Sequence, residues 1–316
     1  MKKGDLKVKK KKVKTVSGNW KTQMGYYLMF IVPAAFVFIF NYVPMGGIWL
    51  AFIDYKPAKG IFGSKFIGME NFSRFFSSID FVRVFRNTIL YNVASIALVS
   101  IFCGILFALL LYEIKSRIGN KIFQTCMLLP SFLSWTVVSA ALFMILSPDN
   151  GMLNSLLESL RMQPRSWYRE QKYWPLIITI AKVYKGAGMA SIYYFAALLS
   201  IDTELFDAAN LDGANRIQQI RHISLPAIRK IFCITLIMNM GNVLTSGVSP
   251  YYELTLDRSE LYETTQVIGT YLYNGLGGGR YSFTTAVGLF ESLVSTILVV
   301  GVNTIVKRVD PENAMF

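Results

Sequence analysis

The chain has 316 residues, of which 53% are hydrophobic, and its mean hydropathy is +0.42. Soluble domains are usually less apolar, so the composition indicates a membrane protein with several spans. The net charge is +13, and nine lysines fall within the first 21 residues without an aromatic or groove-reading motif. This pattern argues against nucleic-acid binding and favours a tail beside an anionic membrane surface. With one histidine, His222, a histidine-rich metal site is excluded.

Six apolar segments are each long enough to cross about 30 Å of hydrocarbon as a helix, the only structure available to a lone segment in lipid. The sequence therefore predicts an all-α integral membrane protein with six transmembrane helices. The six segments are residues 26–50, 87–111, 122–146, 174–199, 228–245 and 282–306.

The charges of the connecting segments predict the orientation. One alternate set of segments carries 18 Lys and Arg, and the other set carries 12. The first set is 1–25, 112–121, 200–230 and 307–316, and the second is 52–86, 147–173 and 247–281. Because positive charge is enriched on the cytoplasmic side, both termini and the 200–230 segment are predicted to be cytoplasmic.

We therefore divide the chain into four parts. Residues 1–25 form a basic cytoplasmic tail, and residues 26–86 hold the first transmembrane helix and an aromatic-rich extracellular segment. Residues 87–306 form a five-helix core that includes the cytoplasmic loop 200–230, and residues 307–316 form a second cytoplasmic tail. The aromatic stretch 64–81 is expected to pack on the membrane domain as short helices.

The cytoplasmic loop carries the signals of two short helices. Asp202 is a suitable N-cap, and Gly213 lies where the first helix should end in a left-handed turn. A second short helix is expected at about 214–223, and Pro226 should mark the boundary with the fifth span. The residues alone fit either an ordinary connection between spans or a docking element for another protein.

Ionisable side chains inside the predicted spans need partners, because each costs about 2.5–3.5 kcal/mol on insertion scales. Lys182 and Lys185 share one face of the fourth span, and Glu291 lies in the sixth. At 1.5 Å per residue, Lys182 and Glu291 both sit about 12–14 Å below the outer interface. They therefore either pair with each other or face a wet cavity, whereas Lys185 has no partner visible in the sequence.

The loop also carries a spaced motif that resembles the EAA loop of the membrane subunits of ABC importers. That loop reads E-A-A, three residues, G, nine residues and I-x-L-P, and every spacing is kept here. Its one departure is Asp where the family has Glu, which keeps the charge but shortens the reach. The matching residues, with two more that fit the sugar-permease version, are Asp207, Ala208, Ala209, Asp212, Gly213, Ala214, Ile223, Leu225 and Pro226.

The resemblance covers nearly the whole chain. Residues 68–72, 87–88 and 129–135 resemble the outer loop and the second and third spans of carbohydrate permeases. Residues 270–290 are similar to a subfamily that imports complex oligosaccharides in Gram-positive bacteria and is often named for lipo-oligosaccharide or polysaccharide transport. The resemblance implies a MetI-like importer-permease core.

The resemblance also implies a function and partners. The chain would be the permease subunit of an ATP-driven carbohydrate importer in the bacterial cell membrane, without enzymatic activity. It would pair with a second permease, two nucleotide-binding ATPase subunits that hold ATP and Mg²⁺, and an extracellular solute-binding protein. Consistent with this, the sequence contains no G-x-x-x-x-G-K-[ST] phosphate loop.

Two other function classes fit less well. A stand-alone ion-coupled secondary transporter should show internal repeats and midplane carboxylates, and Glu291 is the only carboxylate in any predicted span. A membrane-embedded enzyme needs a catalytic constellation that one histidine does not supply.

Sugars are usually held by aromatic stacking and planar polar groups, which defines the candidates for the substrate pathway. Asn239 and Asn242 share a face and serve equally well as hydrogen-bonding contacts between helices. In this family, the position of Lys185, before a glycine, often faces the pathway, and an unpaired lysine would suit an acidic saccharide. The pathway candidates are Lys185, Tyr184, Tyr193, Trp135, Asn239, Asn242 and Glu291.

Overall fold

A computed structural model describes residues 20–149, 151–245 and 247–309. Most of the basic tail and the last seven residues therefore lie outside the described residues. The chain forms two compact units that divide after Trp49, and each is described by itself.

The first unit is an apolar helical segment. Helix α1 spans Trp20–Val37, a π-helical stretch η1 follows at Phe38–Tyr42, and the 3₁₀ helix η2 at Val43–Phe52 leads into the second unit. Large apolar side chains such as Phe30, Val32 and Phe36 are exposed around the helix. Such an all-round apolar surface is typical of a helix in lipid.

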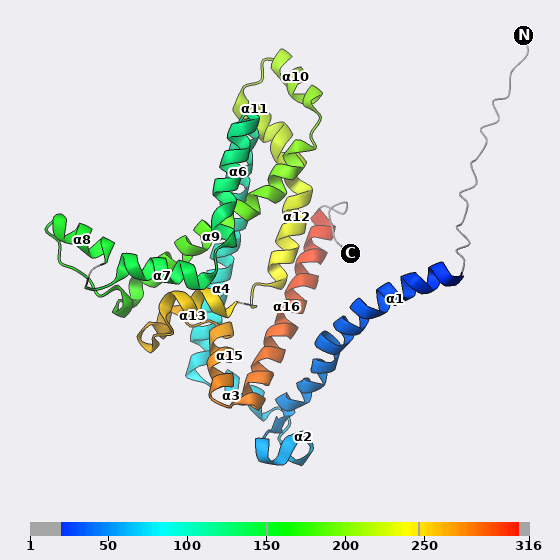
Figure 1. The fold of residues 1–316 in the computed structure, drawn as a ribbon, viewed down its shortest axis with the longest axis vertical. Coiled ribbons are helices and arrows are strands. Elements are labelled where there is room, and N and C mark those ends of the chain that lie inside the picture. Colours follow the sequence, from blue (N-terminus) through cyan, green and yellow to red (C-terminus); the bar gives the residue numbers. More distant parts are fainter. Residues whose placement is uncertain (1–19, 150, 246, 310–316) are drawn as a thin grey trace, which may run out of the picture. The chain divides into compact units, whose positions relative to one another are not determined.

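The second unit is helical apart from one pair of two-residue antiparallel strands, β1 and β2. Figure 1 shows its long helices α4, α6, α12 and α16 running between α10 at one end and α3 at the other. Its elements are β1 Ile53–Asp54, η3 Pro57–Lys59, α2 Gly60–Gly63, β2 Lys65–Phe66, α3 Glu70–Phe76, α4 Ile79–Ser95, η4 Ile96–Cys103, α5 Gly104–Glu113, α6 Arg117–Phe132, α7 Trp135–Leu146, α8 Met152–Ser159, η5 Trp167–Arg169, η6 Gln171–Tyr173, α9 Trp174–Leu199, α10 Thr203–Leu211, α11 Arg216–Gln219, η7 Ile220–Ser224, α12 Leu225–Gly241, α13 Val248–Thr255, η8 Ser259–Leu261, α14 Tyr262–Thr265, α15 Ile268–Gly277 and α16 Tyr281–Val309.

Four described helices are long and apolar enough to cross a membrane, or five segments if one bent pair counts as a span. The four are Met24–Phe52, Ile79–Glu113, Arg216–Gly241 and Tyr281–Arg308. The all-α membrane fold is therefore confirmed, whereas the predicted number of six spans is not reached by this criterion. The predicted fourth span forms the 26-residue helix α9, but Lys182 and Lys185 lower its hydropathy.

The predicted third span is broken into two helices. Helix α6 ends at Phe132, α7 begins at Trp135, and their axes differ by 93°. Pro130 has no N–H to continue the ladder, and the Ser134 hydroxyl caps α7 by accepting from the Val137 amide at 3.2 Å. The apolar segment predicted at 122–146 is therefore interrupted, and its two helices pass the criterion for a membrane span only when they are taken together as one bent pair.

Two further boundaries differ from the predictions. The second candidate span begins at Ile79, because Ser78 caps α4 by accepting from the Phe81 amide. The expected short helix at about 214–223 does not end before Pro226 but continues as one helix to Gly241. The π-helical turn η7 precedes Pro226, and such turns accommodate interrupted hydrogen bonding.

The aromatic stretch 64–81, expected as short helices, forms strand β2 at Lys65–Phe66, the short helix α3 at Glu70–Phe76 and the start of α4. Phe75 is buried and contacts the rings of Tyr271, Phe283 and Phe290 on α15 and α16. These ring contacts bind the segment to the helix bundle.

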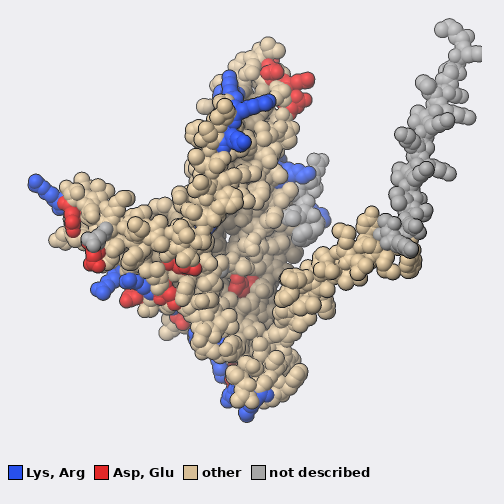
Figure 2. Space-filling view, in the orientation of Figure 1, with Lys and Arg blue, Asp and Glu red and all other residues tan. Residues whose placement is uncertain are grey.

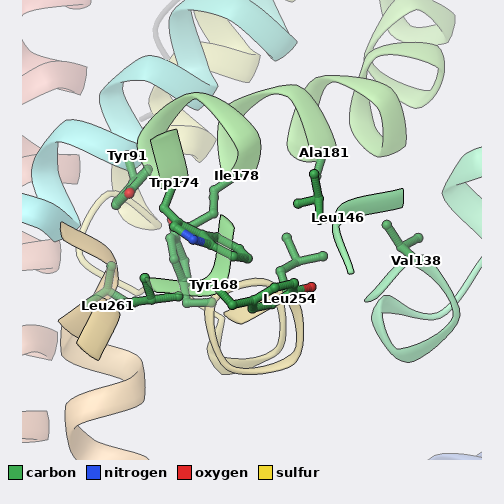
Figure 3. Close-up of a cluster of buried hydrophobic side chains, with 11 residues drawn as sticks. Tyr91, Val138, Leu146, Tyr168, Trp174, Ile178, Ala181, Leu254 and Leu261 are labelled. Carbon is green, nitrogen blue, oxygen red and sulfur yellow. The ribbon is translucent and has the colours of Figure 1, made fainter. Parts of the chain in front are cut away.

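A second cluster lies around the first turn of α9 (Figure 3). Trp174 is fully buried, and its indole N–H donates to the Trp167 carbonyl at 2.9 Å. Tyr168, Ile178, Leu254 and other buried side chains complete this cluster. The segments that precede and follow the spans are thus packed against α9 rather than left as free loops.

Candidate functional site: the 202–226 loop and the polar groups of the spans

The 202–226 loop comprises α10, a turn, α11, η7 and the start of α12. As predicted, Asp202 caps α10, accepting a hydrogen bond from the Glu204 amide at 3.0 Å. Gly213 ends it with a φ of +77°, a left-handed conformation that glycine adopts without steric cost. The ring of Phe206 lies 5.8 Å from that of Tyr112, which links α10 to the end of α5.

A buried amide joins the two helices of the loop. Gln219 donates to the Asn210 side chain at 2.7 Å and to the Ala214 carbonyl at 3.2 Å. It accepts from Arg216 at 3.0 Å, and Arg216 lies 3.3 Å from Glu113 at the end of α5. Sequence reasoning missed this network. A readable signal did exist nearby, because Asn215 and Gln218 form a capping box.

The loop presents a hollow of about 400 Å³ to its surroundings. Gln218, Gln219 and His222 line this hollow. Five of the nine predicted residues also line it, namely Ala209, Asp212, Gly213, Ala214 and Ile223. Asp207 and Ala208 are exposed beside it on α10. Leu225 and Pro226 line a separate hollow of about 340 Å³ with Arg221 and Phe232.

Aliphatic side chains are exposed at this polar end of the unit. Leu211 is 91% exposed and Ile217 is 76% exposed, although Figure 2 shows charged side chains gathered over α10 and α11.

The Lys185 side chain binds backbone carbonyls at the break between α6 and α7. Its ammonium group donates to the carbonyls of Ser131, at 2.9 Å, and Leu133, and it lies 5.5 Å from the centre of the Trp135 ring. The last carbonyls of a helix lack partners within the helix, and a cation nearby stabilises them. Two of the pathway candidates, Lys185 and Trp135, thus lie together, and the ammonium group has partners that the sequence did not reveal.

Lys182 and Glu291 do not form the ion pair considered above. Lys182 donates to the Tyr251 hydroxyl at 2.9 Å and to the Asn92 side chain at 3.4 Å. Glu291 is buried on α16. No ion pair joins Lys182 and Glu291 in the described part of the chain.

The remaining pathway candidates are spread over several surfaces. Asn239 donates to the Thr235 carbonyl at 2.8 Å and lies 3.5 Å from Ser100, whereas Asn242 bonds only its own helix, at the Met238 carbonyl. Tyr184 and Tyr193 are each about half exposed. The structure does not gather these four side chains into one described cavity.

Comparison with known proteins identifies the family. Residues 100–314 match the model described as the binding-protein-dependent transport system inner membrane component. The chain belongs to this family. It is therefore the membrane permease component of an ABC-type importer, it lacks a nucleotide-binding domain, and ATP is hydrolysed by a partner subunit. The alternative of a stand-alone ion-coupled transporter is thereby excluded.

Relatives of this permease are similar over most of their length. Protein LplB of Bacillus subtilis is 37% identical, with 92% of this chain and 91% of the relative covered. The polygalacturonan/rhamnogalacturonan transport system permease protein YteP of the same organism is 33% identical, with 96% and 94% covered. The crystal structure of a bacterial ABC transporter involved in the import of the acidic polysaccharide alginate contains a chain 31% identical, with a TM-score of 0.83 and 92% and 97% covered.

Proposed function

We propose that this permease forms half of the translocation pathway of an ATP-driven oligosaccharide importer and is driven through its 202–226 loop. The observation that carries the proposal is the exposed two-helix loop, in which Gln219 and Gly213 hold α10 and α11 around a hollow. The saccharide class rests on the relatives, which are named for polygalacturonan and rhamnogalacturonan transport and for alginate import.

The partners follow from the same family. We infer that a second permease completes the pathway, that two nucleotide-binding subunits receive the loops, and that an extracellular solute-binding protein delivers the sugar. A related transporter has been crystallised with a periplasmic protein that holds an alginate pentasaccharide.

We propose six spans, with both termini and the 202–226 loop on the ATPase side of the membrane. Helix α9 supports this number, because its 26 residues correspond to about 39 Å of helix, more than the hydrocarbon thickness. The bent pair α6 and α7 would be the third span. The excess of Lys and Arg in the alternate segments supports the orientation.

The loop residues have distinct roles in this proposal. Ala209, Gly213 and Ala214 leave the hollow open for a side chain of the ATPase subunit, while Asp207 and Asp212 offer charge at its rim. Leu225 and Pro226 begin the helix that carries the movement toward the pathway. ATP-driven approach of the two ATPase subunits would then bias the spans between two arrangements.

Two substitutions test the coupling role. Gly213→Pro cannot adopt a positive φ, and Ala209→Trp would fill the hollow, so both should abolish uptake while the protein still inserts in the membrane. The matched control is Ala58→Trp. Ala58 is an exposed alanine in the segment between β1 and β2, far in sequence from the 202–226 loop. Oligosaccharide uptake and membrane abundance would be measured together. Normal uptake by both loop variants would refute the docking role.

Co-purification tests the assembly. The tagged chain, extracted from its native membrane in mild detergent, should bring with it a second permease and an ATPase with a phosphate loop. Recovery of the chain alone from membranes that show ATP-dependent uptake would contradict the proposed assembly.

A further inference from the structure

A second hollow, of about 580 Å³, lies where the first turns of α4 meet the segments between the fifth and sixth spans. It is far from the 202–226 loop, because Figure 1 places α3, α13 and α15 toward the opposite end of the unit from α10. None of the pathway candidates lines it. Its walls combine tyrosine rings, planar amides and guanidinium groups.

One wall of the hollow is a network of polar groups joined by hydrogen bonds. The Asp257 carboxylate accepts from the Tyr262 hydroxyl at 2.7 Å and from the Asn274 amide at 3.2 Å, and Asn274 also donates to Tyr262 at 2.9 Å. Burial raises the pKa of Tyr262 to about 12, so its hydroxyl keeps the proton that it donates. Leu256 and Asp257 both have positive φ, at 55° and 48°. Such conformations are costly for residues other than glycine, and they persist where the surrounding structure enforces them.

The opposite wall holds two arginines in different states. Arg83 pairs with Asp80 at 2.6 Å and donates to Gln266 at 2.8 Å, while its Nε is buried without a partner. Arg280 forms no ion pair with any described carboxylate and lies beside the rings of Tyr271, at 6.0 Å, and Phe283, at 5.7 Å. The guanidinium group of Arg280 therefore has N–H donors available to an anion in the hollow.

Aromatic faces complete the hollow. The rings of Tyr252 and Tyr273 meet edge to face at 5.0 Å, and Tyr273 is half exposed. The face of a tyrosine ring stacks on the apolar face of a sugar ring, while amides and carboxylates form hydrogen bonds with the hydroxyl groups of the sugar. A guanidinium fork binds a carboxylate through two parallel hydrogen bonds. A sugar ring that carries a carboxylate satisfies all three kinds of group.

We propose that this hollow is a uronate-binding site outside the spans, in which Arg280 holds the sugar carboxylate and Tyr273 contacts the ring. The inference deepens the proposed import function, on which it rests for the supply of oligosaccharide. The site would hold one acidic residue of the saccharide at the outer mouth of the permease. Asp257 and Asn274 would face its hydroxyl groups.

Direct binding to the full-length chain in nanodiscs tests the site. The probe is trigalacturonate, and its methyl ester, which keeps the rings but removes the charge, is the matched ligand. The protein variants are Arg280→Gln, Arg280→Lys and the control Arg169→Gln, which removes an exposed arginine that does not line the hollow.

We expect Arg280→Gln to weaken trigalacturonate binding about tenfold or more, the loss typical of one charged hydrogen-bonding partner. Arg280→Lys should retain part of the affinity, because it keeps the charge but not the fork. Arg169→Gln should bind like the unmodified chain, and the methyl ester should bind weakly to every variant.

Two results would overturn the site: no trigalacturonate binding by the unmodified chain, or equal affinity of Arg280→Gln and Arg169→Gln. ATP-dependent uptake by the assembled transporter, measured in parallel, separates this failure from failure of the proposed function. Uptake without Arg280-dependent binding would reject only the proposed uronate site. Arg280-dependent binding without any saccharide uptake would reject only the import function.

Discussion

The ammonium group of Lys185 has two backbone carbonyl partners and an aromatic face, so its role in the structure is to complete the end of α6. Sequence alone could not show this. A lysine in a span signals a need for partners, but backbone carbonyls at a helix break carry no residue-type signature. The sequence alone therefore also favours this side chain as a substrate ligand.

Replacement of Lys185 tests which role dominates. Lys185→Gln should lower the stability of the detergent-solubilised permease by about 1.5–3 kcal/mol, the usual loss for charged hydrogen bonds. Uptake of neutral and acidic oligosaccharides should then fall by the same factor. Thermal unfolding and uptake assays with both substrates measure the two effects, and Lys185→Arg is the conservative control. Selective loss of acidic substrate would instead identify Lys185 as a charge-recognising residue.

Lys182 and Glu291, which do not pair with each other, show a second limit of prediction from sequence at the residue scale. Helix rise predicts an equal depth in the membrane for the two side chains, but depth does not determine which face of each helix meets its neighbour. Lys182 donates to Tyr251 and Asn92 on other elements, whereas Glu291 is buried away from it on α16. Buried polar groups find partners, but the identity of those partners depends on packing.

At the scale of elements, the contact between α6 and α9 depends on a glycine. A Cβ atom at Gly188 would lie 1.9 Å from the Met127 carbonyl oxygen, closer than any real contact. Since the obstacle is backbone, no side-chain rotation can relieve it, and the two helices would have to separate. Small residues allow such close approach between helices in membranes.

Gly188→Ala should therefore destabilise the permease by about 3 kcal/mol, at the upper end of the range for overpacking. Gly301→Ala is the matched control, because no atom lies within 4 Å of its added Cβ. The control should be neutral or slightly stabilising, since alanine favours the helix by about 1 kcal/mol. Melting temperatures in the same detergent compare the two. Equal melting temperatures would show that α6 and α9 do not pack as closely as described.

At the scale of the whole molecule, the bend between α6 and α7 determines the path of the proposed third span. A single apolar stretch was readable from the sequence, and Pro130 and Ser134 marked a possible break. The 93° bend depends on the docking of Lys185 and Gly188, which sequence patterns do not show. The 202–226 loop is easier to predict, because its caps and its glycine turn are local signals.

Cysteine labelling of whole cells tests the proposed topology. In a background without the three native cysteines, an impermeant maleimide should label Glu158→Cys and Glu260→Cys from outside but not Glu204→Cys. All three side chains are exposed in the described structure. Labelling of Glu204→Cys in permeabilised cells controls for reactivity. Protection of Glu158→Cys in intact cells would mean that α6 and α7 return to the side they came from.

The unbroken path from α11 through η7 to α12 has a mechanical consequence. Residues Arg216–Gly241 form one helix of about 39 Å, so in the proposed mechanism a rotation applied at its α11 end would be transmitted along α12. The π-helical turn at Ile220–Ser224 interrupts the regular α-helical hydrogen bonding along this path. In the proposed mechanism, the stiffness of these five residues would determine how much of the movement of the ATPase subunits reaches the pathway as rotation.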